Sequence, residues 1–480
     1  MGTRFSRATL VAATAMCSAQ AASAQLIPVK TIPVAQSEQF AFFPSQGRTA
    51  MSMVLVDSLM DPLNNPAKGA LLGRSQYFGA PSFFSVTGNA GGGTTLPMGG
   101  LWKRGNSFAG LALAFQQIDR PVDNGGFFPV FDSGTGFASG PTEQPSQSNR
   151  YAFAMFGHTL DSARLSFGGS VLWSNLRSVD GTDQFYDGNQ SLSQLGDAVD
   201  IRLGLTRTFR GGRSLEAMLL RNRFATSHEV GFIDLFWDPA SRTTRSRPRI
   251  ETNAERSNVW GLHLEYEHPL DSGWRLGALA TTNLISHPRI PSYAVTSGLG
   301  SKGRATAFNL GMGVGHTSKL MSFGLDAIYE PITNHSWIAD TVDNRFRFNN
   351  ARLRGGVSRD FPMLTPGNAV RMQFGAEYHW INYNLHQDDR VNSVMREQDH
   401  SWLERGRSGG VSFISPGLQL HYQVTTKRGV GRPGVIDTDD TFFAPDILSV
   451  APWGGPNIAP VGLGAVSVSR HLFSISVPVR

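Results

Sequence analysis

The sequence predicts an all-β fold: a closed antiparallel transmembrane β-barrel of about 14 strands (14 to 16), with an amino-terminal hatch or plug segment. Three observations carry the barrel prediction, and the hatch is expected from the segment around Asn65 described below. Apolar and polar residues alternate along many segments, short and long connections between these segments alternate, and an export signal precedes them all. The expected division is a signal peptide at 1–24, a hatch at 25–78 and the barrel at 79–480.

The composition agrees with a β protein. The chain has 53 Gly and 31 Phe among 480 residues, and each Gly weakens a helix by about 1 kcal/mol. So much aromatic surface seeks burial, which argues against a disordered chain. No run of about 18 apolar residues follows the export signal, so no membrane-spanning helix is expected.

The first residues read as a secretory signal. Arg4 and Arg7 form its basic end, residues 8–19 its apolar centre, and residues 22–24 (Ala-Ser-Ala) its cleavage site. The only cysteine, Cys17, lies inside this signal. The mature chain would therefore contain no cysteine, which suits the oxidising bacterial envelope.

The clearest alternation is "AFNLGMGVGHTSKLMSFGLDAIYEP" at 307–331. Its glycines follow a G-x-G-x-G spacing, whereas a dinucleotide-binding turn needs G-x-G-x-x-G before a helix. Side chains alternate across a strand with period two. The stretch is therefore predicted to be a hairpin whose glycines face the barrel interior: Phe308, Leu310, Met312 and Val314 lie on one face, and Asn309, Gly311, Gly313 and Gly315 on the other.

The same period recurs in further segments of about 10 to 13 residues. A tilted strand needs about 9 to 11 residues to cross a bilayer, whereas strands of soluble sheets have about 5 or 6. Lipid offers no hydrogen-bond partners, so such strands must close into a ring. A secreted β-sandwich or propeller is the alternative. The first of these segments contains Tyr151, Phe153 and Met155. The others lie near 165–174, 199–206, 260–267, 370–380 and 418–424.

Segment ends and connections support a membrane barrel. Aromatic residues near the segment ends are expected to form interfacial girdles: Trp173, Tyr266, Trp274, Tyr329 and Trp380. Short turns such as "LDSA" and "HTSK" alternate with long connections near 118–148, 176–197, 225–256 and 384–408. Short turns on one side and long loops on the other are typical of outer-membrane barrels.

The segment between the signal and the first strand contains "AMSMVLVDSLMDPLNNPAKGALLG", with Asn65, Pro66 and Ala67 near its end. This stretch resembles the amino-terminal hatch of FadL-type hydrophobic-compound transporters and of the related PorV-type barrels. In those families an Asn-Pro-Ala motif follows a short helix and precedes strand one. The resemblance implies that residues 25 to about 80 sit inside or beneath the barrel and control passage. A lumen filler that supports the wall is the alternative role.

Aromatic groups within the long connections are candidate ligand-binding residues, because exposed apolar patches normally mark a binding or association surface. The resemblance implies that outer loops form a groove for an incoming hydrophobic ligand. A surface for a partner protein and packing over the barrel mouth are the alternatives. The candidates are Phe127, Phe128, Phe131, Phe232, Phe236 and Trp237, with Phe442, Phe443 and Trp453 in a third group.

The stretch "SRTTRSRPRIETNAER" carries five arginines between Arg242 and Arg256. Contact with lipopolysaccharide phosphates is one hypothesis, because Arg binds phosphate as a fork; a solvated loop is the other. Nucleic acid is not expected as a partner.

No catalytic residues, metal ligands or cofactor are predicted. Adjacent residues such as Asn334-His335-Ser336 cannot be assumed to form a triad. There is no H-E-x-x-H motif. The inward-facing His263, His379 and His421 are explained by a polar lumen.

The expected function is passive uptake of hydrophobic small molecules across the bacterial outer membrane. The alternative is a non-transporting barrel that acts as a scaffold or shuttle in an envelope protein complex. A general porin ranks third, because an open pore leaves the hatch unexplained.

Overall fold

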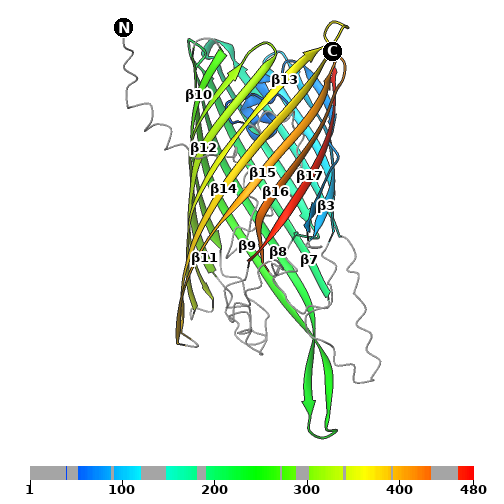
Figure 1. The fold of residues 1–480 in the computed structure, drawn as a ribbon, viewed down its shortest axis with the longest axis vertical. Coiled ribbons are helices and arrows are strands. Elements are labelled where there is room, and N and C mark those ends of the chain that lie inside the picture. The colour runs from blue at the N-terminus through cyan, green and yellow to red at the C-terminus, as the bar shows by residue number, and fades with distance from the viewer. Residues whose placement is uncertain are drawn as a thin grey trace, which may run out of the picture.

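A computed structural model describes residue 39 and residues 52–87, 91–119, 147–180, 191–270, 273–287, 302–338, 342–390, 393–433 and 463–479. The strands form one antiparallel sheet that closes on itself (Figure 1). They are β1 (Ser75–Gly79), β2 (Ser82–Val86), β3 (Gly92–Arg104), β4 (Ser107–Asp119), β5 (Gln147–Leu160), β6 (Leu165–Leu176), β7 (Ser191–Thr208), β8 (Ser214–Asp238), β9 (Thr243–Pro269), β10 (Trp274–His287), β11 (Lys302–Thr317), β12 (Met321–Ile338), β13 (Val342–Pro362), β14 (Ala369–Asp389), β15 (Val394–Ile414), β16 (Gln419–Pro433) and β17 (Leu463–Val479).

The first wall strand is interrupted by proline. β1 and β2 both pair with β17 and β3, and the register of β1 continues unchanged into β2. The break falls at Ala80-Pro81, where proline has no N–H to donate to a neighbour. Backbone hydrogen bonds still join this break to both neighbouring strands: Ala80 N donates to Pro97 O (2.9 Å), and Phe473 N donates to Pro81 O (2.9 Å). Counting β1 and β2 as one strand, the barrel has 16 strands, the upper end of the expected range.

The expected inward and outward faces are confirmed for the hairpin β11–β12. Phe308 and Met312 are 45% and 57% exposed on the outer surface, whereas Gly311, Gly313 and Gly315 are buried inside. The predicted girdle residues are also exposed outward: Trp173, Tyr266, Trp274, Tyr329 and Trp380. Such an apolar outer face with aromatic residues is what an outer-membrane wall presents to lipid.

β5 departs from this pattern. Tyr151, Phe153 and Met155 are buried and face the barrel interior, while Phe156 faces outward. Both faces of β5 are apolar, since Ala152 and Ala154 lie between these inward residues. The alternation along this segment therefore marks a strand without showing which face meets lipid.

Two of the expected long loops are in fact strands. Residues 225–256 form the outer parts of β8 and β9, and residues 384–408 belong to β14 and β15. The expected segment length of 10 to 13 residues holds for β3, β4 and β6, with 13, 13 and 12 residues, and is too short for β8 and β9, with 25 and 27. Figure 1 shows β8 and β9 projecting from one end of the barrel as a two-stranded ribbon. Polar residues interrupt the apolar ones at 225–231 of β8 and 251–256 of β9, so no apolar period marks these stretches.

The short turns lie at the opposite end of the barrel from this ribbon. β17 ends at that side too (Figure 1), which by the rule for such barrels is the periplasmic side. Helical turns are few in the described ranges: α3 (Asp61–Asn64), η1 (Pro66–Leu71) and η3 (Asp161–Ala163). None of the helices in these ranges is long and apolar enough to cross a membrane.

Candidate functional site: the hatch and its seat in the wall

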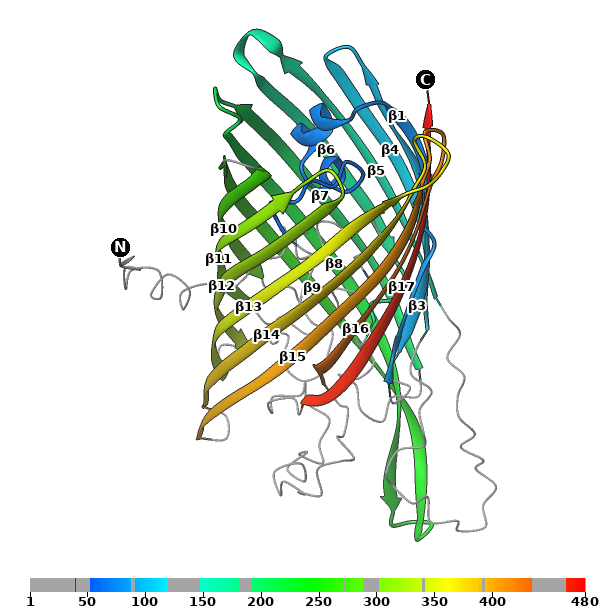
Figure 2. The same ribbon diagram turned by 45° about the horizontal axis from the view of Figure 1, so that its top comes forward.

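The hatch, defined from here on as residues 52–72, lies inside the short-turn end of the barrel (Figure 2). Its two helical pieces follow from local sequence. Pro62 occupies the first turn of α3, where no N–H is required. Asn65 caps η1, because its Oδ1 accepts a hydrogen bond from Ala67 N at 3.1 Å. The expected position of the Asn-Pro-Ala motif after a short helix and ahead of the first strand is thereby observed.

Glycines of the wall make room for this motif. Gly168 on β6 and Gly204 on β7 are paired across the sheet and both face inward. A Cβ on Gly168 would come within 2.8 Å of the Pro66 carbonyl carbon, and one on Gly204 would overlap Asn65 Oδ1. Any larger residue at either position would therefore push the motif away from the wall.

A second glycine track holds the other end of the hatch. Gly277, Gly313, Gly315 and Gly324 lie on β10, β11 and β12 in paired positions. Side chains of Ser52, Met53 and Val54 occupy the space that Cβ atoms on these glycines would take. The G-x-G-x-G spacing of β11 thus forms the seat of residues 52–54.

Glu216 on β8 binds the hatch through Asn65 of the motif and through Lys68, the residue that follows the motif. Its Oε1 lies 3.0 Å from Lys68 Nζ, and its Oε2 accepts a hydrogen bond from Asn65 Nδ2 at 3.1 Å. Both Lys68 and Glu216 are largely shielded from solvent. Sequence reasoning assigned no role to Lys68 or Glu216. The two residues are far apart in the chain, and a single sequence offers no signal that joins them.

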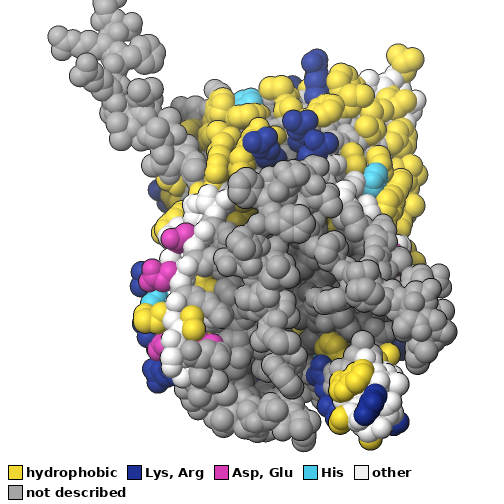
Figure 3. All heavy atoms as spheres, turned by 60° about the horizontal axis from the view of Figure 1, so that its bottom comes forward, with side chains coloured by type: hydrophobic (Ala, Val, Ile, Leu, Met, Phe, Trp, Pro, Cys, Tyr) yellow, Lys and Arg dark blue, Asp and Glu magenta, His cyan; other side chains and the backbone are white. Residues whose placement is uncertain are grey.

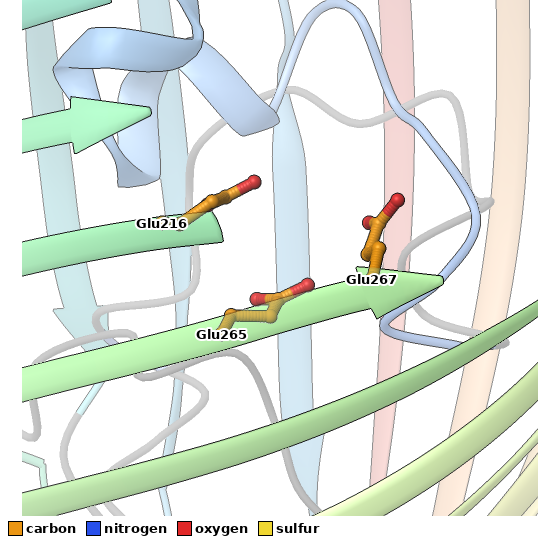
Figure 4. Close-up of side chains that lie close together, drawn as sticks. All are labelled: Glu216, Glu265 and Glu267. Atoms are coloured by element: carbon orange, nitrogen blue, oxygen red, sulfur yellow. The ribbon is translucent and has the colours of Figure 1, made fainter. Parts of the chain in front are cut away.

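Glu216 belongs to a set of three carboxylates that reach into the lumen beside the hatch (Figure 4). The other two are Glu265 and Glu267 on β9. One carboxylate oxygen of each of the three residues lies within 4.8 Å of one oxygen of each of the other two. Burial alone would lower the pKa of Lys68, but these carboxylates and Asp61 hold it well above its ordinary value. Carboxylate oxygens are suitable ligands for Ca²⁺ or Mg²⁺, yet here the Lys68 ammonium already supplies their positive partner.

Asp61 is buried within the hatch. Its Oδ2 accepts a hydrogen bond from Asp57 N at 2.9 Å. Burial raises the pKa of Asp61 to about 8, with Lys68 opposing the rise and Asp57 adding to it. At neutral pH the docked hatch therefore favours the protonated, uncharged form of this carboxyl.

A second ionic anchor lies at the other end of the hatch. Asp326 on β12 accepts hydrogen bonds from Ser52 Oγ at 2.6 Å and from Met53 N at 2.7 Å. Arg354 on β13 lies 2.9 Å from the same carboxylate through its Nε. All these groups are buried, so the carboxylate is fully engaged by the hatch and by one arginine.

Backbone carbonyls complete the attachment. Lys103 Nζ donates to Ala70 O (2.6 Å) and Leu72 O (2.8 Å), and Arg202 Nη1 donates to Asn64 O (2.8 Å). These bonds replace partners that the last carbonyls of a helical segment lack.

Gln39 is anchored at the opposite end of β4 and β6, where the long connections lie. Its Nε2 donates to Ser178 O at 3.0 Å, and Gln116 Nε2 donates to its carbonyl at 2.6 Å. The amino-terminal segment therefore contacts the wall near both ends of the barrel.

The inner wall has an apolar side and a charged side. Leu59, Leu63 and Leu72 of the hatch pack against inward side chains of β1 and β3–β8, notably Phe78, Leu101, Phe108, Tyr151, Phe153, Met155, Leu172 and Phe224. On β12–β15 the inward residues include an ionic group, and Phe346, Phe348, Ile381 and Leu385 form a separate apolar cluster. There His379 lies 3.3 Å from Glu330 and 3.2 Å from Glu404, and Arg352 lies 3.3 Å from Glu330.

The predicted ligand-binding aromatics are only partly described. Phe127, Phe128 and Phe131 lie outside the described residues, as do Phe442, Phe443 and Trp453. Phe232, Phe236 and Trp237 lie on strand β8 rather than in a loop. The structure does not bring these three to one surface, because Trp237 points to the opposite face of the ribbon from Phe232 and Phe236.

The ribbon has two different faces. Phe232 and Phe236 continue the inner face of the wall and carry arginines above their rings, with Arg249 Cζ 4.5 Å and Arg247 Cζ 5.7 Å from the ring centroids. The other face continues the outer surface and is apolar: Ile233, Trp237 and Ile250 are 53%, 62% and 63% exposed. Figure 3 shows hydrophobic and basic side chains together on the protruding ribbon.

The sequence Asn334-His335-Ser336 lies on β12, where neighbouring side chains point to opposite faces. Ser336 is buried inside, whereas His335 Nε2 lies 2.7 Å from Asp343 Oδ1. His335 and Ser336 therefore do not converge. His263, His379 and His421 face inward, as expected.

A closed wall of 16 strands, an apolar outer face and an internal hatch define the chain as an outer-membrane β-barrel with a lumenal hatch. No family model and no curated protein matches its sequence. Among solved structures, it is similar to a Pseudomonas aeruginosa FadL homologue, with 13% identity, a TM-score of 0.41, and coverage of 91% of this chain and 98% of that one.

Two further structures are similar in the same way. A bacterial polysaccharide outer membrane secretin has 7% identity and a TM-score of 0.40, over 85% of this chain and 99% of that one. The FrpB iron transporter from Neisseria meningitidis has 10% identity and a TM-score of 0.34, over 88% and 83%. At these identities the likeness concerns the barrel fold alone.

Proposed function

We propose that this barrel takes up hydrophobic small molecules passively, and that the hatch gates their passage, as in FadL-type transporters. The observation that carries the proposal is the apolar inner wall of β3–β8, which the hatch covers. Barrel lumens are ordinarily polar. An aromatic-lined strip under a separately seated segment is suited to apolar cargo, because displacing the segment would expose that strip.

Apart from its chain connection to β1, the hatch is held to the described wall by noncovalent contacts, so gating requires that these contacts open. Lys68 and Asn65 bind Glu216 at one end, and Ser52 and Met53 bind Asp326 at the other. A ligand that favours the displaced hatch would shift this equilibrium by its difference in affinity for the two states.

A reversible crosslink tests the gate. A Cβ on Gly277 would lie 3.9 Å from Val54 Cβ, which suits a disulfide. In a background with no other cysteine in the mature chain, Val54→Cys with Gly277→Cys would tie the hatch to β10. Uptake of a hydrophobic fluorescent probe should stop in the oxidised protein and return on reduction.

The matched control is a disulfide within the wall. Ser191 and Gly231 are paired on β7 and β8, and a Cβ on Gly231 would lie 3.8 Å from Ser191 Cβ. The pair Ser191→Cys and Gly231→Cys should leave uptake unchanged under both conditions. Equal uptake with the hatch crosslinked and free would mean that the hatch is a fixed filler.

Phe232 and Phe236 are proposed as the first contacts for an incoming ligand. They lie on the ribbon face that continues the inner wall, with arginines Arg247 and Arg249 beside them. Replacing both phenylalanines with Ser should reduce the uptake rate at low ligand concentration while leaving barrel assembly intact.

A role as scaffold or shuttle for an envelope protein is the second candidate, and the apolar outer face of the ribbon favours it. Ile233, Trp237 and Ile250 are exposed there beyond a polar stretch of β8 and β9. Exposed patches of this kind mark association surfaces. Trp237→Ser with Ile250→Ser should release a copurifying protein and spare uptake if this role holds.

A further inference from the structure

Three arginines lie side by side on the outer surface of β15 and β16. Arg405 is directly opposite Arg428 across the sheet, and Arg407 is the next outward residue along β15. All three side chains are exposed. Like charges placed directly opposite each other on neighbouring strands destabilise a sheet, so this arrangement needs a partner.

The described wall supplies no carboxylate to this cluster. The outward neighbours in register are Tyr378 and Ala376 on β14, Thr426 on β16, and Ser467 and Ser469 on β17. Among the described residues, none of these three arginines has a salt bridge of its own. The neighbouring side chains instead offer hydroxyl groups, which can also donate hydrogen bonds to an anion.

The cluster lies at the outer edge of the lipid-facing band. With a rise of about 3.3 Å per residue and a tilt of about 40°, Arg407 and Arg405 stand roughly 18 and 23 Å from the short-turn end of β15. The apolar band of such barrels is about 25 Å tall. Val411 and Phe413 face outward on the short-turn side of the cluster.

This height decides the free-energy cost of an arginine on the outer surface and the kind of ligand that such an arginine can reach. Arginine on the lipid face costs about 2–4 kcal/mol at the bilayer midplane and about 0–1 kcal/mol near the interface. At the interface of the outer leaflet, phosphate groups of the surrounding lipid lie at the same height as these guanidinium groups. Arg binds phosphate through two parallel N–H donors, a geometry that Lys cannot match.

We propose that Arg405, Arg407 and Arg428 form a binding site for the phosphate groups of lipid A in the outer leaflet. Tyr378, Thr426 and Ser467 border the site and supply further donors. The bound phosphates would offset the repulsion between Arg405 and Arg428, and would fix one glycolipid against β15 and β16. This site is independent of the hatch and of the proposed uptake.

Native mass spectrometry of the mature protein, extracted gently from its outer membrane, tests the proposal. The variant combines Arg405→Gln, Arg407→Gln and Arg428→Gln. The matched control makes the same change in charge at the short-turn end, with Arg207→Gln, Arg213→Gln and Arg359→Gln, all exposed residues. Heat-modified mobility on a gel shows that each barrel is folded.

The wild type and the control should retain bound lipopolysaccharide, whereas the variant should retain at least tenfold less. In a second arm, added lipid A should raise the Tm of the delipidated wild type but not that of the variant, and dephosphorylated lipid A should raise neither. Equal retention in the variant would overturn the proposal. So would a gain in Tm from phosphatidylglycerol or inorganic phosphate as large as that from lipid A.

Discussion

Removing the positive charge of Lys68 should loosen the hatch. Lys68→Met leaves Glu216 buried without its cationic partner, 3.0 Å away in the native protein. Breaking a buried ion pair by removing one partner costs about 3–5 kcal/mol. Glu265 and Glu267 add repulsion, since their oxygens lie within 4.8 Å of those of Glu216. We therefore expect hatch docking to weaken by about 3 kcal/mol, a factor of roughly 150 in the population of the undocked state.

Hydrogen exchange of the peptide 66–72 measures this population. Ala67 N, Lys68 N and Leu72 N are hydrogen-bonded within the hatch, so they exchange when it undocks and frays. Their exchange should accelerate by about two orders of magnitude in Lys68→Met. Lys319→Met, at an exposed turn between β11 and β12, is the control and should show no change.

A double-mutant cycle separates the ion pair from general loss of packing. Combining Lys68→Met with Glu216→Gln removes the uncompensated carboxylate, so the double variant should be more stable than the sum of the two single changes by about 2–3 kcal/mol. An acceleration below fivefold in Lys68→Met, or strictly additive effects, would refute the assignment of Lys68 as the main anchor.

Three further predictions concern the docking of the hatch against the barrel wall. Gly168→Ala should weaken hatch docking by about 1–3 kcal/mol, because the added Cβ would press on Pro66. The neighbouring Gly169 faces outward, and a Cβ there would make an ordinary 3.5 Å contact with Leu203. Gly169→Ala should therefore leave hydrogen exchange of the hatch as in the wild type. Because docking raises the pKa of Asp61 from 3.8 to about 8, the docked state binds the extra proton. The contribution of Asp61 to docking should be fully present below about pH 4, and it should fall by up to about 1.4 kcal/mol per unit as pH rises to 8. Asp61→Asn should abolish that dependence in exchange measured at pH 6 and pH 8, and an unchanged slope would disprove it. Asp326→Asn leaves Arg354 without its charge partner and should expose residues 52–54 to protease before residues 66–72 are affected; simultaneous release of both ends would show that the anchors are not separate.

The lipid-facing wall was predictable because its cause is local. A strand that meets lipid on one side and the lumen on the other must alternate with period two. The hairpin at 307–331 shows this alternation in a short window, so Phe308 and Met312 were placed outward and Gly311 inward. The position of Asn65-Pro66-Ala67 ahead of the first strand was likewise readable, because a turn and cap need particular residues next to each other.

Where period two was absent or ambiguous, the prediction failed. β5 is apolar on both faces, so its sequence does not tell that Tyr151 and Phe153 face the hatch rather than lipid. Residues 225–256 lack an apolar period, so their sequence predicts a loop. Their strand structure depends on pairing between β8 and β9, and on contacts such as Arg249 above Phe232.

A closed outer-membrane barrel was predictable from the amino-acid sequence, because alternation and turn chemistry act over a few neighbouring residues; the hatch was expected from the resemblance carried by Asn65-Pro66-Ala67. The role of the glycines of β6, β7 and β11, and the contact between Lys68 and Glu216, became visible in the folded barrel alone. Those contacts join segments more than a hundred residues apart, and their energy depends on burial and distance, which exist only once the barrel has closed.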